Sequence, residues 1–281
     1  MKVIIIGAGR VGTVIGYLLQ ENGFEILGVN NKHLNSASEA VKLIGDGECF
    51  TRKELEKNIK LADLIIVTTP DDVIADIADF LTRCNLKKPV YLMHMSGLYP
   101  SHILNKNCIK GCHVFSLHPL QAVASFNEGV KLLPVATFSL EGDEKGLEFG
   151  IKLSDRLNLN YCLIKSENKS LYHAAAVIAS NYLVTLVNSS YEVLAKAGIQ
   201  DKDIRNGILN LISGTLSNLE NMEPAEALTG PVARNDINTI KEHRKKLEEI
   251  VPEQLKLYNI LGEYTAKMAD KQQLLQIFKN E

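Results

Sequence analysis

Three glycines at fixed spacing near the start of the chain form the motif Gly7-Ala8-Gly9-Arg10-Val11-Gly12. The motif directly follows a short apolar run and opens a stretch with helical spacing, which is the context that a dinucleotide-binding turn requires. In such a turn the first glycine permits a tight bend, the second lets the backbone approach the pyrophosphate, and the third lets helix and strand pack closely. The N-terminus of the helix would then face the diphosphate with free N–H groups. The motif predicts a dinucleotide site, and an ordinary glycine-rich turn is the alternative.

The end of the second apolar run indicates which dinucleotide would bind. NAD sites place Asp or Glu there to hold the ribose 2′-hydroxyl, whereas this chain has Asn30, Asn31, Lys32 and His33. Lys32 and His33 are cationic or can become so, and Arg10 in the glycine-rich turn can add to their charge. A 2′-phosphate would therefore be accepted, which favours NADP(H). The alternative is that Lys32 is a solvated loop charge.

A later segment, Lys169–Lys196, has helical spacing and carries polar residues among Ala, Val, Ile and Leu. At about 100° per residue, five of these polar residues fall within one arc of about 100°. They are Ser170, His173, Ser180, Asn181 and Asn188. A polar stripe on a buried helix must find partners or line a cavity. Because histidine can act as a general acid near neutral pH, we expect His173 to donate a proton and Asn181 to position the substrate. A stripe satisfied by a dimer partner or by loops is the alternative.

The elements that must position these residues alternate in the first half of the chain. Its short runs are continuously apolar, as strands buried on both faces of a parallel sheet are. The runs are Val3–Ile6, Ile26–Val29, Leu64–Thr68, Val90–Met93, Val114–Leu117, Val135–Ser139 and Tyr161–Ile164. The helical stretches are Val11–Gln20, Thr51–Lys60, Asp72–Leu81 with Asp71 as its cap, Asp143–Leu157, Lys169–Lys196, Asp203–Leu219, Asp236–Glu249 and Pro252–Phe278. The pattern predicts an α/β fold: a Rossmann-like, doubly wound, mostly parallel sheet in residues 1–165, followed by an all-helical domain in residues 166–281.

Ligands in open α/β sheets bind at the carboxyl ends of the strands, and two histidine-containing segments lie there. His94-Met95-Ser96-Gly97 leaves the fourth run, and Leu117-His118-Pro119 leaves the fifth. Ser96 can hold the nicotinamide amide or the substrate, and Gly97 gives the backbone clearance. His118 is expected to face the cleft. For both histidines the alternative is a buried, hydrogen-bonded structural residue.

Length, composition and charge exclude several classes of protein. The chain has 281 residues, 46% of them hydrophobic and 23% charged, which fits one large or two ordinary globular domains. With 31 Lys and Arg against 33 Asp and Glu, it lacks the basic excess of a nucleic-acid binder. No apolar run reaches about 18 residues, and the N-terminal run is too short for a signal peptide, so we expect no membrane span. Five cysteines without a CxxC pair predict reduced thiols and a cytoplasmic protein.

Cysteines and histidines also gather between residues 94 and 118, which raises the question of a metal site. The residues are His94, His102, Cys108, Cys112, His113 and His118. The cysteines lack a matching second pair, and several of these residues lie on a strand, where they would point to alternate faces. We therefore expect no metal.

Several segments together carry a resemblance to a known family. They are Gly7–Gly12, Val67–Asp71, His94–Gly97, Leu117–Gln121, Leu171–Asn181 and Gly230–Arg234. On these segments the chain resembles a family of uncharacterised NADP-dependent oxidoreductases with a Rossmann-like N-terminal domain and a helical C-terminal domain of unknown function. That family lies in the superfamily of 6-phosphogluconate dehydrogenase, ketopantoate reductase and pyrroline-5-carboxylate reductase. The resemblance implies a fold and a cofactor, but no substrate.

The resemblance also implies roles for particular residues. It places the turn Thr68-Thr69-Pro70 beside the cofactor, although a strand stop with a helix cap explains the same residues. Prephenate dehydrogenases are similar at the His118-Pro119 pair and carry it near their substrate. Ketopantoate reductase places a catalytic lysine and asparagine on the long helix at i and i+4. Here the lysine position falls at His173 or Val177, so no lysine is supplied, and Lys169 lies one turn early. The related families dimerise through the helical domain, and apolar stretches such as residues 183–187 favour a homodimer here as well.

Arg234 follows Gly230-Pro231 in a loop that enters a helix. Because arginine can hold a carboxylate with two parallel hydrogen bonds, Arg234 is a candidate for substrate binding. A surface ion pair with Asp236 or Glu226 is the alternative.

Together these features predict an NADP(H)-dependent reductase or dehydrogenase. A hydride would pass between the nicotinamide and a small carbonyl, imine or hydroxy substrate in the interdomain cleft, with His173 donating the proton and Asn181, Ser96 and His118 positioning. The residues expected to hold the cofactor are Gly7, Gly9, Arg10, Val11, Gly12, Asn30, Asn31, Lys32, Thr68, Thr69, Pro70, His94 and Ser96. A non-catalytic dinucleotide-binding or sensing protein is the main alternative, favoured by the missing lysine. A pyrroline-5-carboxylate or prephenate-type enzyme is a third.

Overall fold

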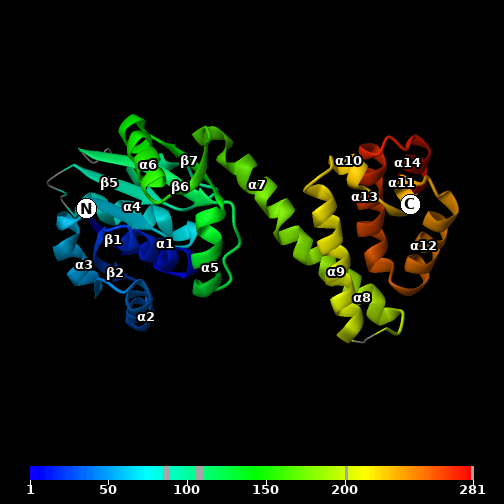
Figure 1. The fold of residues 1–281 in the computed structure, drawn as a ribbon, viewed down its shortest axis with the longest axis horizontal. Coiled ribbons are helices and arrows are strands. Elements are labelled where there is room, and N and C mark those ends of the chain that lie inside the picture. Colours follow the sequence, from blue (N-terminus) through cyan, green and yellow to red (C-terminus); the bar gives the residue numbers. More distant parts are fainter. Residues whose placement is uncertain (85, 87–88, 106–110, 200–201, 280–281) are drawn as a thin grey trace. The chain divides into compact units, whose positions relative to one another are not determined.

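A computed structural model of the chain describes residues 1–84, 86, 89–105, 111–199 and 202–279 (Figure 1). The chain divides into two compact units, residues 1–180 and residues 181–281, and each is described by itself. The boundary predicted at residues 165 and 166 falls inside the first unit. It lies between the last strand and helix α7 (Lys169–Ala179), which groups with the first unit.

The first unit is built on one sheet of eight strands in the order β3-β2-β1-β4-β5-β6-β7-β8 (Figure 1). Its strands are β1 (Lys2–Ile6), β2 (Glu25–Asn30), β3 (Glu48–Cys49), β4 (Leu64–Val67), β5 (Val90–His94), β6 (Cys112–Pro119), β7 (Thr137–Gly142) and β8 (Asn160–Leu163). All neighbours are parallel except β6 and β7. The strand order reverses between β1 and β4, which is where ligands bind in open sheets of this kind. The predicted Rossmann-like, mostly parallel sheet is confirmed.

The helices of the first unit follow the predicted rhythm. They are α1 (Arg10–Glu21), α2 (Leu34–Ile44), α3 (Arg52–Asn58), α4 (Ile74–Arg83), α5 (Phe126–Leu132), α6 (Glu144–Arg156) and α7. The sequence analysis did not predict α2, β3 and α5. The buried face of α2 consists largely of small alanines that give a weak periodic signal. Asp71 does not cap the next helix with its side chain, since a short 3-10 turn, Asp71–Val73, precedes α4. The run Val135–Ser139 likewise begins in a 3-10 turn, and the strand starts only at Thr137.

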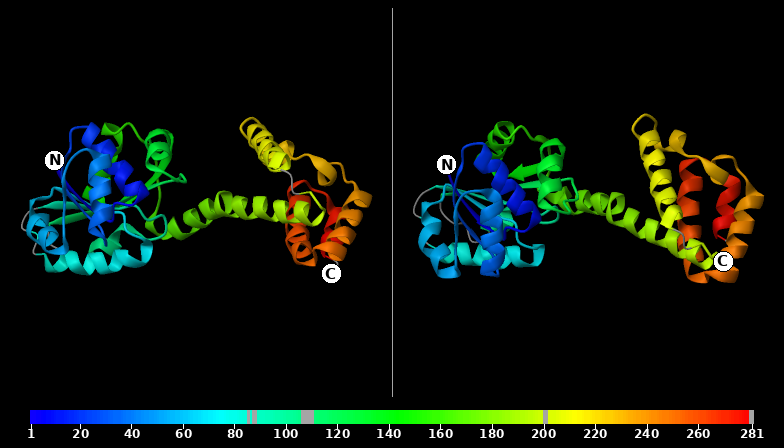
Figure 2. Two further views of the ribbon diagram at one scale, coloured as in Figure 1. Left: turned by 90° about the horizontal axis from the view of Figure 1, so that it is seen from below. Right: turned by 60° about the horizontal axis from the view of Figure 1, so that its bottom comes forward.

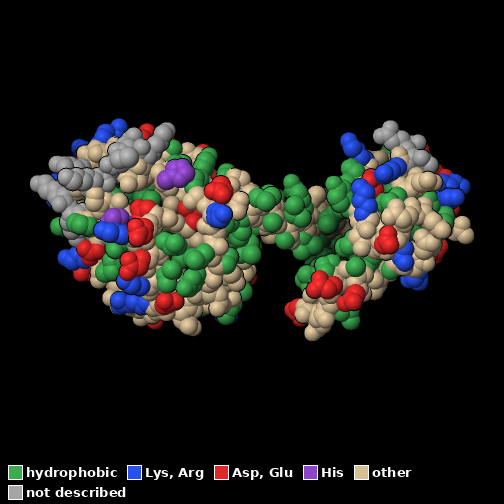
Figure 3. Space-filling model, turned by 90° about the horizontal axis from the view of Figure 1, so that it is seen from above, with side chains coloured by type: hydrophobic (Ala, Val, Ile, Leu, Met, Phe, Trp, Pro, Cys, Tyr) green, Lys and Arg blue, Asp and Glu red, His purple; other side chains and the backbone are tan. Residues whose placement is uncertain are grey.

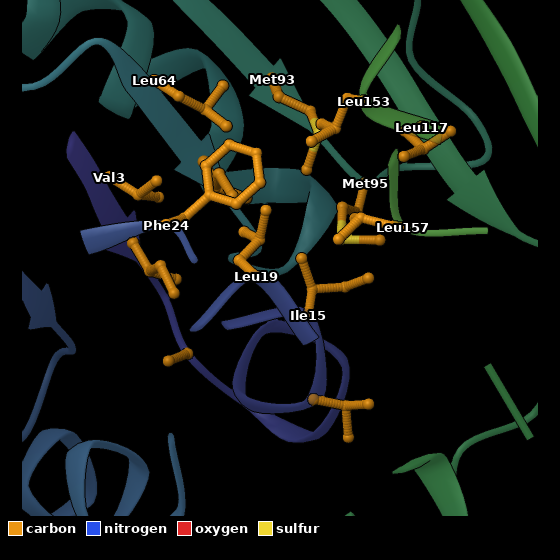
Figure 4. Packing of buried hydrophobic residues seen from close by; sticks show 14 of the residues in the cluster. Val3, Ile15, Leu19, Phe24, Leu64, Met93, Met95, Leu117, Leu153 and Leu157 are labelled. Carbon is orange, nitrogen blue, oxygen red and sulfur yellow. The ribbon is translucent and has the colours of Figure 1, made fainter. Parts of the chain in front are cut away.

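Both faces of the sheet are covered, which explains the continuously apolar strands. Val3 and Ile5 of β1 pack with α1, α2 and α6, whereas Ile4 and Ile6 point to the opposite face and pack with α3 and α4. The first of these clusters is drawn in Figure 4, where Leu19 of α1 lies among strand side chains. Successive residues of a strand point to opposite faces, so a strand covered on both sides needs apolar residues at every position.

The regular elements of the second unit are helices in the described residues, and Figure 2 shows them in yellow-green to red. They are α8 (Asn181–Lys196), α9 (Lys202–Leu219), α10 (Pro224–Ala227), α11 (Gly230–Ala233), α12 (Ile237–Ile250), α13 (Pro252–Met268) and α14 (Gln272–Lys279). Two helices predicted as continuous are interrupted. Lys169–Lys196 is divided at Ser180, and Pro252–Phe278 is divided where Asp270 takes a left-handed φ of +52°.

The helical stretch Ser166–Lys196 is long and apolar enough, by length and composition, to cross a membrane. The mean hydropathy of its 18-residue window is 1.3, and 0% of that window is buried. Core helices of soluble proteins pass the same compositional test. The sequence analysis expected no membrane span because it considered only uninterrupted apolar runs. The stretch Ser166–Lys196 contains polar residues, but its mean hydropathy is still high. Figure 3 shows hydrophobic side chains at the surface of the helical segment that follows the sheet.

Candidate functional site

The glycine-rich turn leaves β1 at the strand reversal and has an open approach. Gly7 has a left-handed φ of +89°, and a Cβ there would lie 2.8 Å from the Thr69 Cα. A Cβ on Gly12 would overlap the Thr68 side chain, so this position requires glycine for close packing. A Cβ on Gly9 would meet only the Gly7 carbonyl oxygen, at 4.0 Å. Gly9 is therefore not required by contacts within the protein, and the space beside it is free for a ligand.

Helix α1 presents its N-terminus at this turn. Gly9 is its N-cap and has no side chain to cover the first backbone donors. By their position in the helix, the N–H groups of Arg10, Val11 and Gly12 lack an intrahelical acceptor. The first turn contains no acidic residue, so the positive end of the helix dipole can act on an anion. This arrangement fits a dinucleotide diphosphate.

The turn after β4 supports the glycine-rich turn from the side. The Thr68 hydroxyl donates a hydrogen bond of 2.8 Å to the Gly7 carbonyl. The Thr69 Oγ1 is buried and has no hydrogen-bond partner in the part of the chain that the structure describes. Pro70 is exposed and ends the strand. Thr68 thus has a structural bond, while the Thr69 hydroxyl has hydrogen-bonding capacity for a ligand.

Some of the polar residues at the end of β2 bond to the backbone, and others are exposed to solvent. Asn30 donates to the Phe50 carbonyl at 2.7 Å, and Asn31 donates to the Ala8 carbonyl at 3.1 Å, so both amides fix the backbone around the turn. Lys32 and Arg10 are exposed. Of the residues predicted for the 2′-phosphate, these two cations are the ones free to meet it.

A polar cluster, here called the histidine site, occupies the carboxyl ends of β5 and β6. On the face that α4 covers, apolar residues alternate up to Leu92 in β5 and Val114 in β6. The next positions on that face are His94 in β5 and Ser116 and His118 in β6. In the antiparallel neighbour β7, Ser139 lies opposite His118 and Glu141 lies opposite Ser116. The histidine site is completed by Ser96, Gly97, Lys169, Tyr172 and His173.

Gly97 lets two histidines approach each other from different elements. A Cβ on Gly97 would lie 2.7 Å from the His173 Nδ1 and 2.9 Å from the His118 Nε2. The two imidazole centroids are 5.9 Å apart with nearly perpendicular rings. The His118 Nδ1 lies 3.4 Å from the Tyr172 hydroxyl. The structure thus brings His118, His173 and the Ser96–Gly97 turn together.

Ser96 is held by hydrogen bonds at several of its atoms. Its backbone N–H donates to the His94 Nδ1 at 3.1 Å, and its hydroxyl oxygen accepts from the backbone N–H groups of Leu98 and Tyr99, both at 3.1 Å. Its carbonyl accepts from the Lys169 ammonium at 2.9 Å. These bonds fix the turn, and the hydroxyl proton of Ser96 is left to donate.

Burial keeps two of the histidines neutral. It lowers the pKa of His94 to about 3 and that of His118 to about 4, and the nearby Lys169 charge lowers both pKa values further. Each histidine is therefore uncharged at neutral pH. His94 is fully buried and its Nδ1 holds the Ser96 backbone, which matches the structural alternative stated for this residue.

Lys169 and Glu141 are functional-site residues that the sequence analysis did not identify. Both are almost fully buried, and the Lys169 Nζ lies 3.9 Å from the Glu141 Oε1. The signal was present in the strand pattern, because Ser116 and Glu141 interrupt otherwise apolar runs. The lysine itself carried no signal, since a lysine at a helix start is ordinarily solvated.

Two of the predicted site residues belong to the other compact unit. Asn181 and Arg234 belong to the second unit and are exposed there. Arg234 contributes with Thr239 to lowering the pKa of Asp236, Thr239 having the larger effect. Of the cysteines and histidines weighed as metal ligands in the sequence, Cys108 lies outside the described residues. Among the described residues, no three His, Cys, Asp or Glu side chains are placed to hold a metal ion.

Comparisons with protein families agree with the two-part organisation. Residues 1–119 match the model of a Rossmann-like domain. Residues 136–265 match the domain of unknown function DUF2520. The chain therefore combines a Rossmann-like N-terminal domain with a DUF2520 helical C-terminal domain, and the predicted resemblance is confirmed.

Solved structures share this fold over nearly the whole chain. A candidate NADP oxidoreductase from Bacteroides fragilis is 24% identical with a TM-score of 0.73, covering 95% of this chain and 98% of its own. A protein from Thermotoga maritima is 26% identical with a TM-score of 0.72, covering 96% and 99%. A 1-pyrroline-5-carboxylate reductase from Streptococcus pyogenes is 16% identical with a TM-score of 0.62, covering 98% of both chains.

One curated protein matches a shorter part of the chain. It is a Trk system potassium uptake protein TrkA homolog from Pyrococcus abyssi, 37% identical over 87 residues. The match covers 30% of this chain and spans 38% of the length of that protein. A match of this extent concerns a segment and not the whole chain.

Proposed function

We propose that the protein is an NADP(H)-dependent oxidoreductase acting on a small carbonyl, imine or hydroxy compound. The observation that carries this proposal is the placement of two features in one unit: the open Gly9 turn follows β1 and the histidine site follows β5 and β6, at the carboxyl ends of parallel strands of one sheet in which only β4 lies between β1 and β5. The proposal is also supported by similar folds in a candidate NADP oxidoreductase and a 1-pyrroline-5-carboxylate reductase. The likeness to the reductase leaves the particular substrate open.

The residues around the turn fit NADP(H). The N-terminus of α1 would hold the diphosphate, and the free Thr69 hydroxyl lies in the turn beside it. Lys32 and Arg10 would hold the 2′-phosphate, because they are exposed cations at the end of β2 and the start of α1. Ser96 and His94 would lie toward the nicotinamide, His94 by holding the Ser96 backbone. When bound, the cofactor supplies or accepts the hydride.

The protein groups of the histidine site would manage the proton and orient the substrate. His173 is the proposed proton donor, because its Nδ1 packs at Gly97 without a hydrogen-bond partner among the described residues. Neutral His118 would act as a positioning group, since burial disfavours its protonation. Asn181 and Arg234 stay proposed substrate-positioning residues contributed by the helical part. A pyrroline-5-carboxylate or prephenate-type activity is one specific form of this proposal, testable with those substrates.

The substitution Gly9→Ala tests the dinucleotide site. A methyl group fits the protein at this position but stands where a pyrophosphate approaches. We expect NADPH affinity to fall at least about tenfold, while thermal stability changes by less than about 0.5 kcal/mol. Gly214→Ala is the matched control, because no atom lies within 4 Å of a Cβ there.

Calorimetric titration and thermal melts of the three proteins give the result. Unchanged NADPH affinity in Gly9→Ala, or no NADPH binding by the wild type, would contradict the proposal. NADPH binding without turnover across a panel of imines, 2-oxo acids and hydroxy acids would favour a sensing protein instead.

We also propose a cytoplasmic homodimer formed through the helical domain. Large apolar side chains are exposed on α7, α8 and α9: Leu171, Ile178, Tyr182, Val184, Leu209, Leu211, Leu216 and Leu219. Exposed apolar surface of this extent marks an interaction site. A second copy of the chain offers the same surface and fits this need without a membrane or a nucleic acid.

A further inference from the structure

Lys169 is the first residue of α7, and its side chain is only 1% exposed. Among the lysines whose side chains the structure describes, it is the only buried one. Its ammonium donates to the Ser96 carbonyl at 2.9 Å and to the Ser116 hydroxyl at 2.6 Å. The Lys169 Nζ also lies 3.9 Å from the Glu141 Oε1. A buried lysine without such partners would be strongly destabilising, so these contacts specify one position for it.

Glu141 is fixed independently of Lys169. One carboxylate oxygen accepts from the Ser101 N–H at 2.7 Å. The other accepts from the Ser101 hydroxyl at 2.9 Å and from the Ser166 hydroxyl at 2.6 Å. The carboxylate thus joins three segments, namely the turn after β5, strand β7 and the turn that precedes α7. A carboxylate held by three donors is fixed in position.

The same contacts connect the two walls of the histidine site. One wall is the Ser96–Gly97 turn, to which Lys169 binds directly. The other wall is α7, on which His173 lies four residues after Lys169 and therefore on the same face. His173 and the Ser96–Gly97 turn meet where a Cβ on Gly97 would be 2.7 Å from the His173 Nδ1.

We propose that Lys169 is a positioning residue of the histidine site, which clamps the first turn of α7 to the Ser96–Gly97 turn and keeps a fixed positive charge beside His118. Its value for catalysis rests on the proposed function. The clamp and the charge themselves are properties of the protein without cofactor.

The positive charge of Lys169 acts on His118 together with the other titratable groups around that ring. From α7, His118 has Lys169, Tyr172 and His173 as neighbours, and from β5 it has His94. On β7 the residue opposite His118 is Ser139, and the charged Glu141 lies 3.9 Å from the Lys169 ammonium. Burial lowers the pKa of Lys169 to about 8, while Glu141 and Asp71 oppose that shift. At neutral pH Lys169 is therefore charged and disfavours a second positive charge on His118. Neutral His118 can then accept a hydrogen bond from the Tyr172 hydroxyl.

The test is a pH titration of the histidine rings by NMR in the full-length protein labelled with ¹³C-histidine, with His118→Gln assigning the signal. Removal of the Lys169 charge should raise the pKa of His118, so Lys169→Met should shift its midpoint upward by about one unit. Lys169→Arg keeps the charge and should leave the midpoint low. Lys165→Met is the matched control, because Lys165 is an exposed lysine four residues earlier. An unchanged His118 midpoint in folded Lys169→Met, or an equal shift in Lys165→Met, would overturn the proposal.

A measurement on the unmodified protein covers the case in which Lys169→Met does not fold. In the wild type labelled with ¹³C-lysine, Lys169 should titrate near pH 8, and the His118 ring signals should respond over the same range. A Lys169 midpoint at the ordinary value of 10.5 with no response of His118 would overturn the proposal. These readouts need no cofactor. A failure of NADPH binding or turnover would therefore contradict the proposed function and leave this result in place.

Discussion

The two units of the molecule differ in how completely they bury their own apolar side chains. The first unit encloses two apolar clusters, one on each face of its sheet. The second has one small buried cluster, made of Ile240, Ala266, Leu274 and Phe278. On α8 and α9, Val184 is 69% exposed and Leu211 is 67% exposed. A sheet covered by helices on both faces completes its own core, whereas α8 and α9 leave large apolar side chains exposed.

The units differ in the same way in their polar groups. In the first unit, Lys169, Glu141 and His94 are buried and hydrogen-bonded or paired, so their positions are fixed. In the second unit, Asn181 and Arg234 are exposed. Fixed polar groups in a buried setting can support chemistry, because their charges and protonation states are set by the protein. We therefore propose that the first unit carries the chemistry and that the second mediates assembly.

A charge in the exposed apolar surface tests the contrast between the units most directly. Val184→Glu places a carboxylate on α8, where the proposed homodimer would bury it without a partner, at a cost of several kcal/mol. Association should weaken at least about 100-fold, as measured by analytical ultracentrifugation. Val135→Glu is the control, because Val135 in the first unit is 70% exposed, against 69% for Val184. It should leave the assembly unchanged.

Two outcomes would contradict this assignment. A wild-type protein that sediments as a monomer at micromolar concentration would remove the need for a partner on the second unit. Equal effects of Val184→Glu and Val135→Glu would mean that the two apolar surfaces are equivalent, and the contrast between the units would fail.

Most of the fold could be predicted from sequence because its strands are short, apolar and bounded by turn residues. The strand ends of β1, β4 and β5 agree with the predicted runs to within a residue or two. The break at Ser180 could not be predicted, because Ser180 and its neighbours continue the helical spacing and no Gly or Pro marks a stop. The end of the predicted helix Pro252–Phe278 was likewise hidden, since the left-handed turn at Asp270 uses no glycine.

The parts of the candidate site that lie in one short sequence motif could be predicted, and the parts that depend on contacts between distant segments could not. Gly7, Gly9 and Gly12 form a contiguous motif with a known physical reason for each glycine. The meeting of His118 and His173 at Gly97 depends on where α7 packs, which no local pattern specifies. The burial of Lys169 depends on Ser116 and Glu141 from two other strands. Tertiary contacts of this kind override the ordinary preference of lysine for solvent.

A comparison of His173 with Asn181 sharpens the division of chemistry between the units. His173→Ala should lower turnover about 10²- to 10⁴-fold if His173 is the general acid. Because the His173 Nδ1 has no hydrogen-bond partner among the described residues, its removal should leave the fold and NADPH affinity intact. Asn181→Ala should cost about tenfold or less, as expected for one positioning hydrogen bond. Steady-state rates with the substrate found in the panel, beside thermal melts, measure both.

The assignment of His173 would fail if His173→Ala kept normal turnover, or if its loss of turnover followed a loss of stability. A larger effect from Asn181→Ala than from His173→Ala would move the chemistry to the second unit.

The smallest expected effect concerns the choice between the two nicotinamide dinucleotides, and it separates cofactor binding in the first unit from substrate binding in the second. Lys32 is an exposed cation at the end of β2, so its attraction for a 2′-phosphate is screened by solvent and amounts to about 1 kcal/mol. The wild type should bind NADPH several-fold tighter than NADH, and Lys32→Glu should remove the difference by repelling the phosphate. Higher salt should narrow the difference between the NADPH and NADH affinities in the wild type, because the interaction is between exposed charges.

Arg234→Ala should leave both dinucleotide affinities unchanged and raise only the KM of an acidic substrate. Equal affinities in the wild type, or tighter binding of NADH, would contradict the choice of NADP(H), whereas a loss of NADPH affinity in Arg234→Ala would show that the second unit also binds the cofactor.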